Sequence, residues 1–507
     1  NENLPTVFAD PNGITNVEAT ATALSNILKI PRRKIEPKLS TDTRYEVIAK
    51  RVSHNRALKV KKAELAGIGL TDTYYRVYPQ RGLAAHVLGF VNDEGKGQYG
   101  IEEHLDDQLK GKNGRLNAVT DVYGIPLTAT EQSVSKPAVD GDDLVLTIDV
   151  NIQKTAEAAI KKVAKQTKAK SASAIVLDPH TGAIKAMASY PTFDPAKFGQ
   201  AKDFSVFINP VVANAYEPGS VIKVFTMAAG LNEGVITPSS KYQNKGEIEV
   251  DGETIENVLQ SVNGQRTMSE VIQYSLNTGV VHVLKELGGG ELNQKGREML
   301  YDYFTDRFNF GKAVKVAQPY ESSGEIFKPN TGIGDNIRYA NMSFGQGMTA
   351  TMVQVASALN PLLNGGDFYK PYLLQSQTDT DGQQTVFESE IIKKNIVSDK
   401  AAKQVKKMMI DVVNKGGGQV AKRDGYAIGG KTGTSQFIDP TTGKYSKKGE
   451  IGSFLGFVGR SVIEVKYSYA HHRHITGDRR NRRDSWVWIL GLCYSYVNYP
   501  NLYNHRI

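Results

Sequence analysis

The chain has 507 residues, more than one ordinary hydrophobic core supports, so two or three domains are expected. Hydrophobic residues make up 40% and charged residues 23%, and the sequence contains neither a signal peptide nor the roughly 20 consecutive apolar residues of a membrane-spanning helix. The single cysteine excludes an internal disulfide framework, and the net charge of +9 lacks the basic blocks that indicate nucleic-acid binding.

Residues 1–139 mix helical patterns with short β-rich pieces such as Thr73–Tyr78, and they hold no nucleophile with a base at catalytic spacing. We therefore expect a non-catalytic N-terminal domain. Pro137, Gly141 and a group of acids precede the apolar strand predicted at Leu144–Ile148, so a second domain is expected to begin at residue 140.

The second domain is predicted to open with a β-hairpin and to end with strands. Apolar strands flank the turn Asp178–Gly182, which is typical of a hairpin within a covered sheet. Helices are predicted at Ser220–Leu231 and Ser269–Leu287, and strands return at Tyr426–Ser435 and Ser453–Gly459. This order favours an α+β domain whose first and last strands share one sheet, with helices on its faces.

Ser220 is a candidate nucleophile at the start of an apolar helix, and Lys223 follows on the same helical face. Burial would lower the pKa of the lysine, so that a neutral amine can accept the serine proton. The N-terminus of the helix would also offer backbone N–H groups to a developing oxyanion. In isolation, however, such a pair is more typical of a helix cap beside a solvated lysine.

Two further polar elements follow. Ser275 and Asn277 offer a hydroxyl and a carboxamide, although such a pair is often only a polar break between helical turns. The run Gly429–Ser435 places Lys431 among glycines and hydroxyls on a predicted strand. A phosphate-binding loop does not fit this run, because no strand-to-helix switch follows Thr432.

Together these elements match the Ser-x-x-Lys, Ser-x-Asn and Lys-Thr-Gly signature of penicillin-binding proteins and serine β-lactamases. The sequence resembles class B penicillin-binding proteins beyond these motifs, over residues 1 to about 460. The segments that resemble their N-terminal pedestal, or dimerisation, domain are Arg76–Pro79, Ala84–Gly89 and Tyr99–Gly111. Those that resemble their transpeptidase domain are Leu144–Gln153, the hairpin at Asp178 and Ser343–Gly347.

The resemblance implies an α+β fold in which a mixed α/β pedestal domain, truncated at its N-terminus, covers residues 1–139. A β-lactamase/transpeptidase-like domain with a central antiparallel sheet covered by helices would follow over residues 140–460. The implied activity is peptidoglycan D,D-transpeptidation: Ser220 attacks a stem peptide that ends in D-Ala-D-Ala, and an amine of a neighbouring stem peptide then takes the acyl group. β-Lactams would acylate the same serine.

The resemblance also implies a role for each motif residue. Lys223 would be the base for acylation, Ser275 a proton relay and Asn277 a clamp on the acyl donor. Lys431 would supply positive potential near the terminal carboxylate. Substrate-binding positions would be Thr432, Gly433 and Thr434, and the oxyanion hole would be the backbone N–H groups of Ser220 and Thr434.

The implied setting is the outer face of a bacterial cell membrane. The family is normally held there by one N-terminal helix, which this sequence lacks. A chain with this short N-terminal domain would rely on a separate glycan polymerase. We expect no cofactor, no metal and no nucleic-acid partner.

Residues 461–507 depart from the family pattern, since they hold both tryptophans, the only cysteine and four of the nine histidines. One hypothesis is that this tail is translated out of frame, which would remove a central strand. The alternative is a divergent tail in which Trp486–Tyr494 closes the domain. His471, His472 and His474 lack a carboxylate or cysteine at ligand spacing, so no metal site is predicted.

Two other functions remain open on sequence grounds. A serine β-lactamase shares the first chemical step but needs a base that activates water, for which Glu321 and Glu325 are candidates by position only. A non-catalytic β-lactam sensor or scaffold would keep the motifs without turnover.

Overall fold

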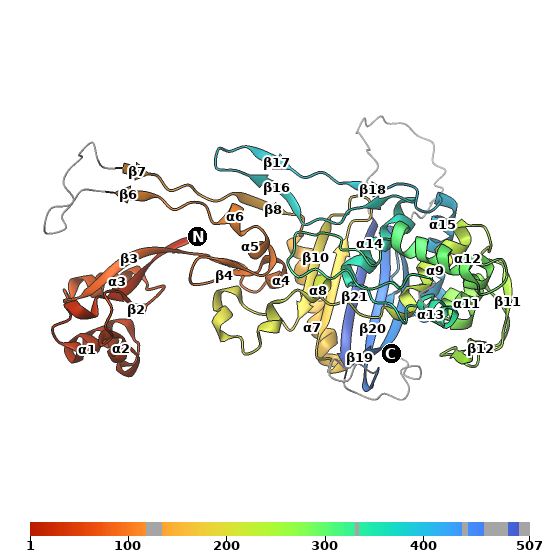
Figure 1. The fold of residues 1–507 in the computed structure, drawn as a ribbon, viewed down its shortest axis with the longest axis horizontal. Helices are drawn as coiled ribbons and strands as arrows, with labels where there is room; N and C mark the ends of the chain where they lie inside the picture. Colours follow the sequence, from red (N-terminus) through yellow and green to blue (C-terminus); the bar gives the residue numbers. More distant parts are fainter. Residues whose placement is uncertain (118–133, 330–333, 439–444, 461–484, 496–507) are drawn as a thin grey trace, which may run out of the picture. The chain divides into compact units, whose positions relative to one another are not determined.

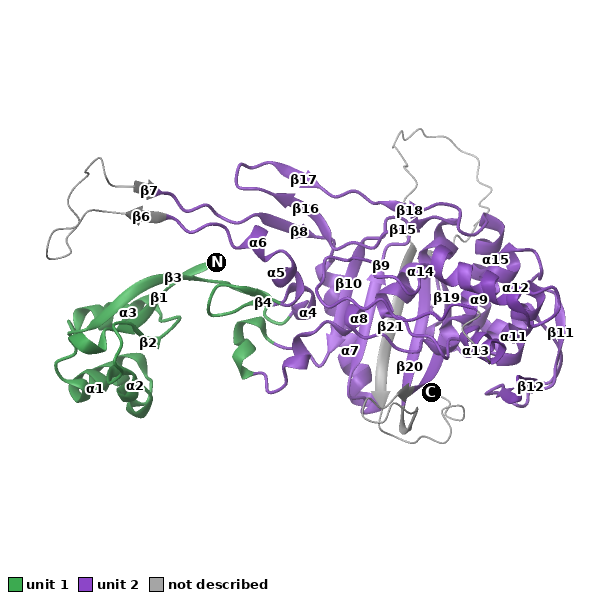
Figure 2. Cartoon of the chain, in the orientation of Figure 1, with its two compact units in different colours: residues 1–82, 90–98, 194–200 green, residues 83–89, 99–193, 201–507 purple. Residues whose placement is uncertain are grey.

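The computed structural model describes residues 1–117, 134–329, 334–438, 445–460 and 485–495. The chain divides into two compact units (Figure 2). The first comprises residues 1–82, 90–98 and 194–200, and the second comprises residues 83–89, 99–193 and 201–507. Within the described ranges, no helix has the length and apolar character needed to cross a membrane.

The first unit is a three-stranded antiparallel sheet packed against helices. Its strand order is β2-β1-β3. Buried side chains such as Val7, Leu24 and Val60 join sheet and helices in one core. Its main elements are β1 (Glu2–Ala9), α1 (Val17–Leu28), α2 (Arg32–Leu39), β2 (Glu46–Ala49), α3 (His54–Lys62) and β3 (Ile68–Tyr75). The strand predicted at Thr73–Tyr78 therefore corresponds to the end of β3.

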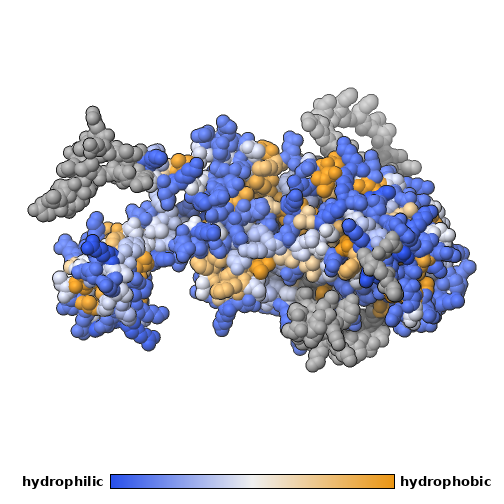
Figure 3. All heavy atoms as spheres, viewed as in Figure 1, coloured by the Kyte–Doolittle hydropathy of each residue, from blue (hydrophilic) through white to orange (hydrophobic). Residues whose placement is uncertain are grey.

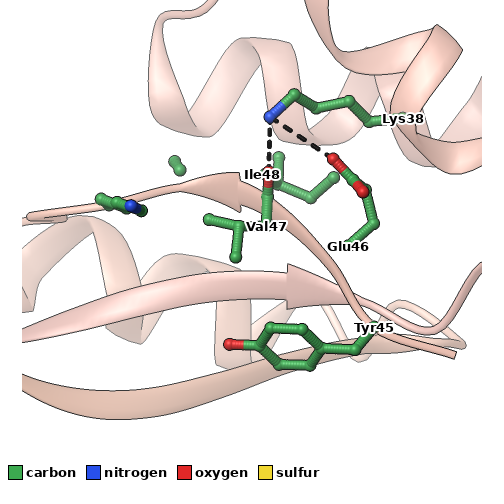
Figure 4. Close-up of a pocket in the computed structure, with 7 residues that line it drawn as sticks. Lys38, Tyr45, Glu46, Val47 and Ile48 are labelled. Atoms are coloured by element: carbon green, nitrogen blue, oxygen red, sulfur yellow. Dashed lines mark hydrogen bonds and ion pairs between the residues drawn. The ribbon is translucent and has the colours of Figure 1, made fainter. Parts of the chain in front are cut away.

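The outer edge of β2 borders a pocket of about 440 Å³ (Figure 4). The Nζ of Lys38 donates a hydrogen bond to the backbone oxygen of Val47 over 2.5 Å and lies 3.7 Å from the carboxylate of Glu46. Because this carbonyl oxygen accepts a hydrogen bond from the lysine, it is less available to the N–H groups of an added strand.

The second unit is built on a five-stranded sheet in the order β10-β9-β21-β20-β19 (Figure 1). All four pairings are antiparallel, as predicted. The strands are β9 (Ala172–Leu177), β10 (Ile184–Tyr190), β19 (Tyr426–Ile438), β20 (Tyr445–Arg460) and β21 (Ser485–Ser495). The expected α+β class is thereby confirmed, with the first hairpin and the last strands in one sheet.

The middle strand of this sheet comes from the atypical tail. β21 pairs with β20 on one side and with β9 on the other, where Leu490 is opposite Ala174. The segment Trp486–Tyr494 thus takes the central place that an out-of-frame tail was expected to leave empty. The reading-frame hypothesis itself stays a prediction, and the three clustered histidines lie outside the described residues.

Helices cover both faces of the sheet. Side chains alternate along β9, so that Ala174 and Val176 pack on α7 (Val150–Thr167) while Ile175 and Leu177 enter the main core. The helices of that main core include α9 (Lys223–Asn232), α11 (Asn277–Leu287), α14 (Met352–Asn364) and α15 (Asp399–Lys415). On the face seen in Figure 3 the surface is mostly hydrophilic, as expected when the apolar residues are inside.

Two predicted helices differ locally from the structure. The helix expected at Ser220–Leu231 begins as a 3₁₀ turn at Gly219–Val221 before α9. The helix expected at Ser269–Leu287 is divided into α10 (Met268–Gln273) and α11. The physical reason for the division is the left-handed backbone of Ser275, with φ of 58°, which no continuous α-helix accommodates.

The other elements are shorter. The helices are α4 (Ala85–Leu88), α5 (Gly100–His104), α6 (Asp106–Leu109), α8 (Pro210–Ala213), α12 (Gln294–Asp302) and α13 (Asp335–Met342). The strands are β4 (Phe90–Val91), β5 (Gly97–Gln98), β6 (Arg115–Asn117), β7 (Val134–Lys136), β8 (Asp143–Leu146), β11 (Lys241–Asn244), β12 (Glu247–Val250), β13 (Glu253–Glu256), β14 (Gly264–Thr267), β15 (Phe368–Tyr369), β16 (Leu374–Thr378), β17 (Gln384–Val386) and β18 (Ile391–Lys393).

Candidate active site

Ser220 is held in a tight turn that lies against strand β19. Gly219, which precedes it, has φ of 60°, and its N–H donates to the backbone oxygen of Gly345 over 3.0 Å. A Cβ added at Gly219 would lie 2.6 Å from the backbone oxygen of Thr434, so only glycine permits this approach. Ser220 itself is half-buried. The turn therefore brings the candidate nucleophile beside the strand that carries the Lys-Thr-Gly motif.

Lys223 is the first residue of α9 and is fully buried. Its Nζ donates to the backbone oxygen of Ser275 over 2.5 Å and lies 3.1 Å from the Oγ of the same residue. A third hydrogen bond, of 2.6 Å, reaches Oδ1 of Asn277. The amine is thus fixed between α9 and the break that separates α10 from α11.

Lys431 approaches the same hydroxyl from β19. Its side chain is buried, and its Nζ lies 2.9 Å from Ser275 Oγ and 2.8 Å from the backbone oxygen of Thr432. Ser275 Oγ is therefore shared by the amines of Lys223 and Lys431. Three motifs that are far apart in the sequence meet at one oxygen atom.

Burial makes both amines easy to deprotonate. Loss of hydration holds the pKa of Lys223 well below its usual value, and the positive charge of Lys431 lowers that pKa further. Burial alone lowers the pKa of Lys431 to about 7. In the part of the chain that the structure describes, neither amine contacts a carboxylate. A neutral amine beside a protonated one is thus accessible near neutral pH.

Asn277 is oriented by two opposite hydrogen bonds. Its Oδ1 accepts from Lys223, while its Nδ2 donates to the backbone oxygen of Glu256 over 2.7 Å. Because Asn277 opens α11, its side chain projects from the start of that helix. The carboxamide cannot rotate without losing one of these bonds.

The β19 motif alternates between buried and open positions. Lys431 and Gly433 are buried, whereas Thr432 and Thr434 are exposed, as expected for successive residues of a strand. A Cβ added at Gly433 would lie 2.4 Å from the Oγ of Ser453. Thr432 and Thr434 therefore lie on the exposed side of β19, beside the nucleophile turn.

The structure brings the predicted catalytic residues together, with one difference in the contacts. Within the described residues, Lys223 bonds to Ser275 and Asn277 and makes no hydrogen bond to the Ser220 hydroxyl. The role of each residue stays a prediction. No group of three or more histidine, cysteine, aspartate or glutamate side chains in the described ranges is arranged to hold a metal ion.

Sequence reasoning gave no role to two residues around the nucleophile. The carboxylate of Glu217 accepts the N–H of Gly347 over 2.8 Å, and the ring centroid of Phe344 lies 5.9 Å from Lys223 Nζ. The signal that could have found them is the pair Gly345 and Gly347, since two glycines so close together suggest a tightly packed turn.

Of the two glutamates considered for a β-lactamase, Glu321 has a carboxylate that is engaged elsewhere, whereas Glu325 is held through its backbone. Glu321 accepts the N–H groups of Val314 and Lys315, over 2.5 and 2.8 Å. The backbone of Glu325 pairs with Thr349. Among the described residues, no hydrogen bond or ion pair joins either side chain to Lys223, Ser275 or Lys431.

A serine at a helix start, two buried lysines that share a second serine, and an edge-strand Lys-Thr-Gly motif define a penicillin-recognising serine acyltransferase. Comparison with known families agrees. Residues 172–464 match the penicillin binding protein transpeptidase domain, and residues 1–146 match the penicillin-binding protein dimerisation domain. The chain belongs to the class B penicillin-binding proteins, which combine these two domains.

Individual relatives support this assignment. The chain is 33% identical to stage V sporulation protein D of Bacillus subtilis, over 90% of this chain and 69% of that protein. It is 28% identical to the probable peptidoglycan D,D-transpeptidase FtsI of Caulobacter vibrioides, over 88% and 68% of the two chains. The crystal structure of penicillin binding protein 3 from Mycobacterium tuberculosis matches with a TM-score of 0.69 and 27% identity, over 83% of this chain and 84% of that one. The same protein has been solved in complex with ampicillin, again with a TM-score of 0.69 and 27% identity, covering 84% of each chain.

Proposed function

We propose that this protein is a peptidoglycan D,D-transpeptidase that cross-links stem peptides through an acyl-enzyme on Ser220. The observation that carries the proposal is the meeting of Lys223 and Lys431 at the hydroxyl of Ser275. This arrangement offers one amine to accept a proton, one to hold positive charge, and a hydroxyl that links them. β-Lactams acylate the same serine.

In the proposed acylation, Ser220 Oγ attacks the penultimate carbonyl of a stem peptide that ends in D-Ala-D-Ala. Its proton passes to the neutral amine of Lys223, which lies one helical turn away. The backbone N–H groups of Ser220 and Thr434 stabilise the oxyanion. When the tetrahedral adduct collapses, the C–N bond breaks and the leaving D-alanine takes a proton through Ser275.

The remaining motif residues position the acyl donor. Asn277 holds a backbone amide of the donor, since its carboxamide is fixed at the edge of the site by Glu256. Protonated Lys431 supplies positive potential to the terminal carboxylate, with hydrogen bonds from Thr432 and Thr434. Gly433 leaves room for the donor backbone.

The acyl-enzyme is then attacked by the amine of a second stem peptide. The new amide bond forms as the Ser220 ester breaks, and the amine proton returns to the serine through Lys223. A hydrolytic β-lactamase would need a carboxylate that activates water at this point. The engagement of Glu321 with two backbone N–H groups argues against that role.

We also propose the cellular setting that the family suggests. Residues 1–139 form the pedestal domain and residues 140–460 the transpeptidase domain, in a protein held at the outer face of a bacterial membrane. A separate polymerase supplies the glycan strands, as the resemblance to class B penicillin-binding proteins suggests.

Intact-mass spectrometry after incubation with benzylpenicillin tests the proposal. We expect one covalent adduct per chain in the wild type, none in Ser220→Ala, and an unchanged adduct in the control Ser239→Ala, whose serine is exposed on a turn. Formation of a D-alanine-releasing cross-link between stem peptides would establish the transfer step. A folded wild type without an adduct would support the scaffold alternative.

A further inference from the structure

A second chain segment is hydrogen-bonded to the nucleophile turn at several points. We call Ser343–Ala350 the clamp segment. The backbone N–H and oxygen of Tyr216 pair with Ala350 over 3.0 and 2.9 Å. Gly219 donates to Gly345 over 3.0 Å, and Glu217 accepts from Gly347 over 2.8 Å. Four hydrogen bonds therefore join the clamp segment to three of the four residues that precede Ser220, namely Tyr216, Glu217 and Gly219.

The clamp segment also contacts the helix that carries the proposed base. Thr226 Oγ1, on the first turn of α9, donates to the backbone oxygen of Ser343 over 2.8 Å. The next residue, Phe344, is buried, and its ring faces the amine of Lys223 with a centroid distance of 5.9 Å. One segment thus contacts both the turn that holds Ser220 and the helix that holds Lys223.

Close packing leaves little freedom at this junction. Gly345 has φ of 86°, and a Cβ added there would lie 2.1 Å from the backbone oxygen of Gly219. The clamp segment and the nucleophile turn are therefore in direct backbone contact. A displacement of one must displace the other, because no flexible side chain separates them.

Glu217 supplies a carboxylate to this set of contacts. The residue is 5% exposed, and a buried carboxylate is costly unless it is hydrogen-bonded. Hydrogen bonds to a charged acceptor are also stronger than neutral ones. The bond from Gly347 is therefore a strong anchor for the clamp segment, two residues beyond its contact with Gly219.

We propose that the clamp segment is a positioning device for Ser220 and Lys223, and that Glu217 is the positioning residue that locks it. Glu217 acts through Gly347 and Gly345 and does not touch the substrate. The inference rests on the proposed acylation of Ser220. It adds a residue that fixes the positions of Ser220 and Lys223 relative to each other. Small displacements matter, since misplacement by 1 Å can cost about 100-fold in rate.

The test is a stopped-flow measurement of acylation by a chromogenic cephalosporin, which separates the first-order acylation constant from the dissociation constant of the initial complex. For Glu217→Ala we expect the acylation constant to fall by about 10- to 100-fold while the dissociation constant changes less than about twofold. Glu217→Gln keeps an oxygen that accepts the Gly347 N–H and should recover most of the rate. Glu253→Ala, at an exposed hairpin position, is the matched control and should acylate like the wild type.

Other outcomes overturn the proposal in distinguishable ways. If Glu217→Ala reduces only the fraction of active enzyme, with an unchanged acylation constant, Glu217 is a stability residue and the positioning role is wrong. If Glu217→Ala does not fold, Phe344→Leu decides: a slower acylation with unchanged initial binding supports the clamp, and an unchanged rate contradicts it. Failure of the wild type to acylate would instead contradict the proposed function.

Discussion

The Nζ atom of Lys431 lies 2.9 Å from the Oγ atom of Ser275, inside a site where burial lowers the pKa of this lysine to about 7. In the unfolded chain the same amine would titrate near 10.5. Between these two values the unfolded state holds a proton that the folded state has lost. Folding is therefore linked to pH, and stability should rise as the pH increases through this window.

We predict that Lys431→Met removes part of this pH dependence. Below about pH 7 the lysine is charged in both states, so the cost of its burial is constant. Above pH 7, the free energy of unfolding of the wild type should rise with pH by up to about 1.4 kcal/mol per pH unit more than that of the variant. Urea denaturation at pH 6.5 and 9.5 measures the difference. The exposed Lys400→Met is the control and should follow the wild type; a constant gap for Lys431→Met would contradict the assigned pKa.

Ser275→Ala should slow acylation far more than it weakens initial binding. The substitution removes the oxygen that both lysines share and interrupts the proposed proton path to the leaving group. Loss of a proton-transfer group typically costs 10²- to 10⁴-fold, so we expect a decrease of at least about 100-fold in the acylation constant. Rapid-quench labelling with a fluorescent penicillin measures it. Ser261→Ala, at an exposed loop position, should have no effect; equal rates for both variants would exclude the relay.

The sequence allowed much of the fold to be predicted, because the relevant signals are local. The hairpin β9–β10 follows from two apolar strands around the turn Asp178–Gly182, and both strands are where the pattern placed them. The three motifs also identified the residues that meet at Ser275, because each motif has a fixed spacing.

What sequence reasoning missed depends on tertiary contacts. The helix break at Ser275 is stabilised by Lys223, which donates to the backbone oxygen of Ser275 from another helix. Nothing in the local pattern requires a positive φ at a serine. The function of Glu217 was equally invisible, since its partner Gly347 is 130 residues away. A single boundary at residue 140 could not indicate that residues 83–89 and 99–139 fall in the second compact unit, or that residues 194–200 fall in the first.

Glu321→Gln should leave the lifetime of the acyl-enzyme unchanged. Burial raises the pKa of Glu321, but its carboxylate accepts the N–H groups of Val314 and Lys315 and so serves to hold a loop. The variant should lose about 1–2 kcal/mol of stability, as expected for weakened charge-assisted hydrogen bonds. Mass spectrometry over hours after β-lactam removal measures deacylation. A much longer-lived adduct in the variant would show that Glu321 activates water and would restore the β-lactamase alternative.

Gly219→Ala should damage both stability and acylation, whereas Gly234→Ala should affect stability alone. Both glycines have positive φ, of 60° and 70°, so each substitution places alanine in the left-handed region at a cost of about 1–2 kcal/mol. At Gly234 no atom lies within 4 Å of the added Cβ, while at Gly219 the oxygen of Thr434 is 2.6 Å away. The extra clash must push the nucleophile turn off β19 and move Ser220 relative to the N–H of Thr434. Thermal unfolding should therefore show a larger loss for Gly219→Ala, and only this variant should acylate slowly with benzylpenicillin. Equal acylation rates in the two variants would mean that contact between the turn and β19 does not set the position of the nucleophile.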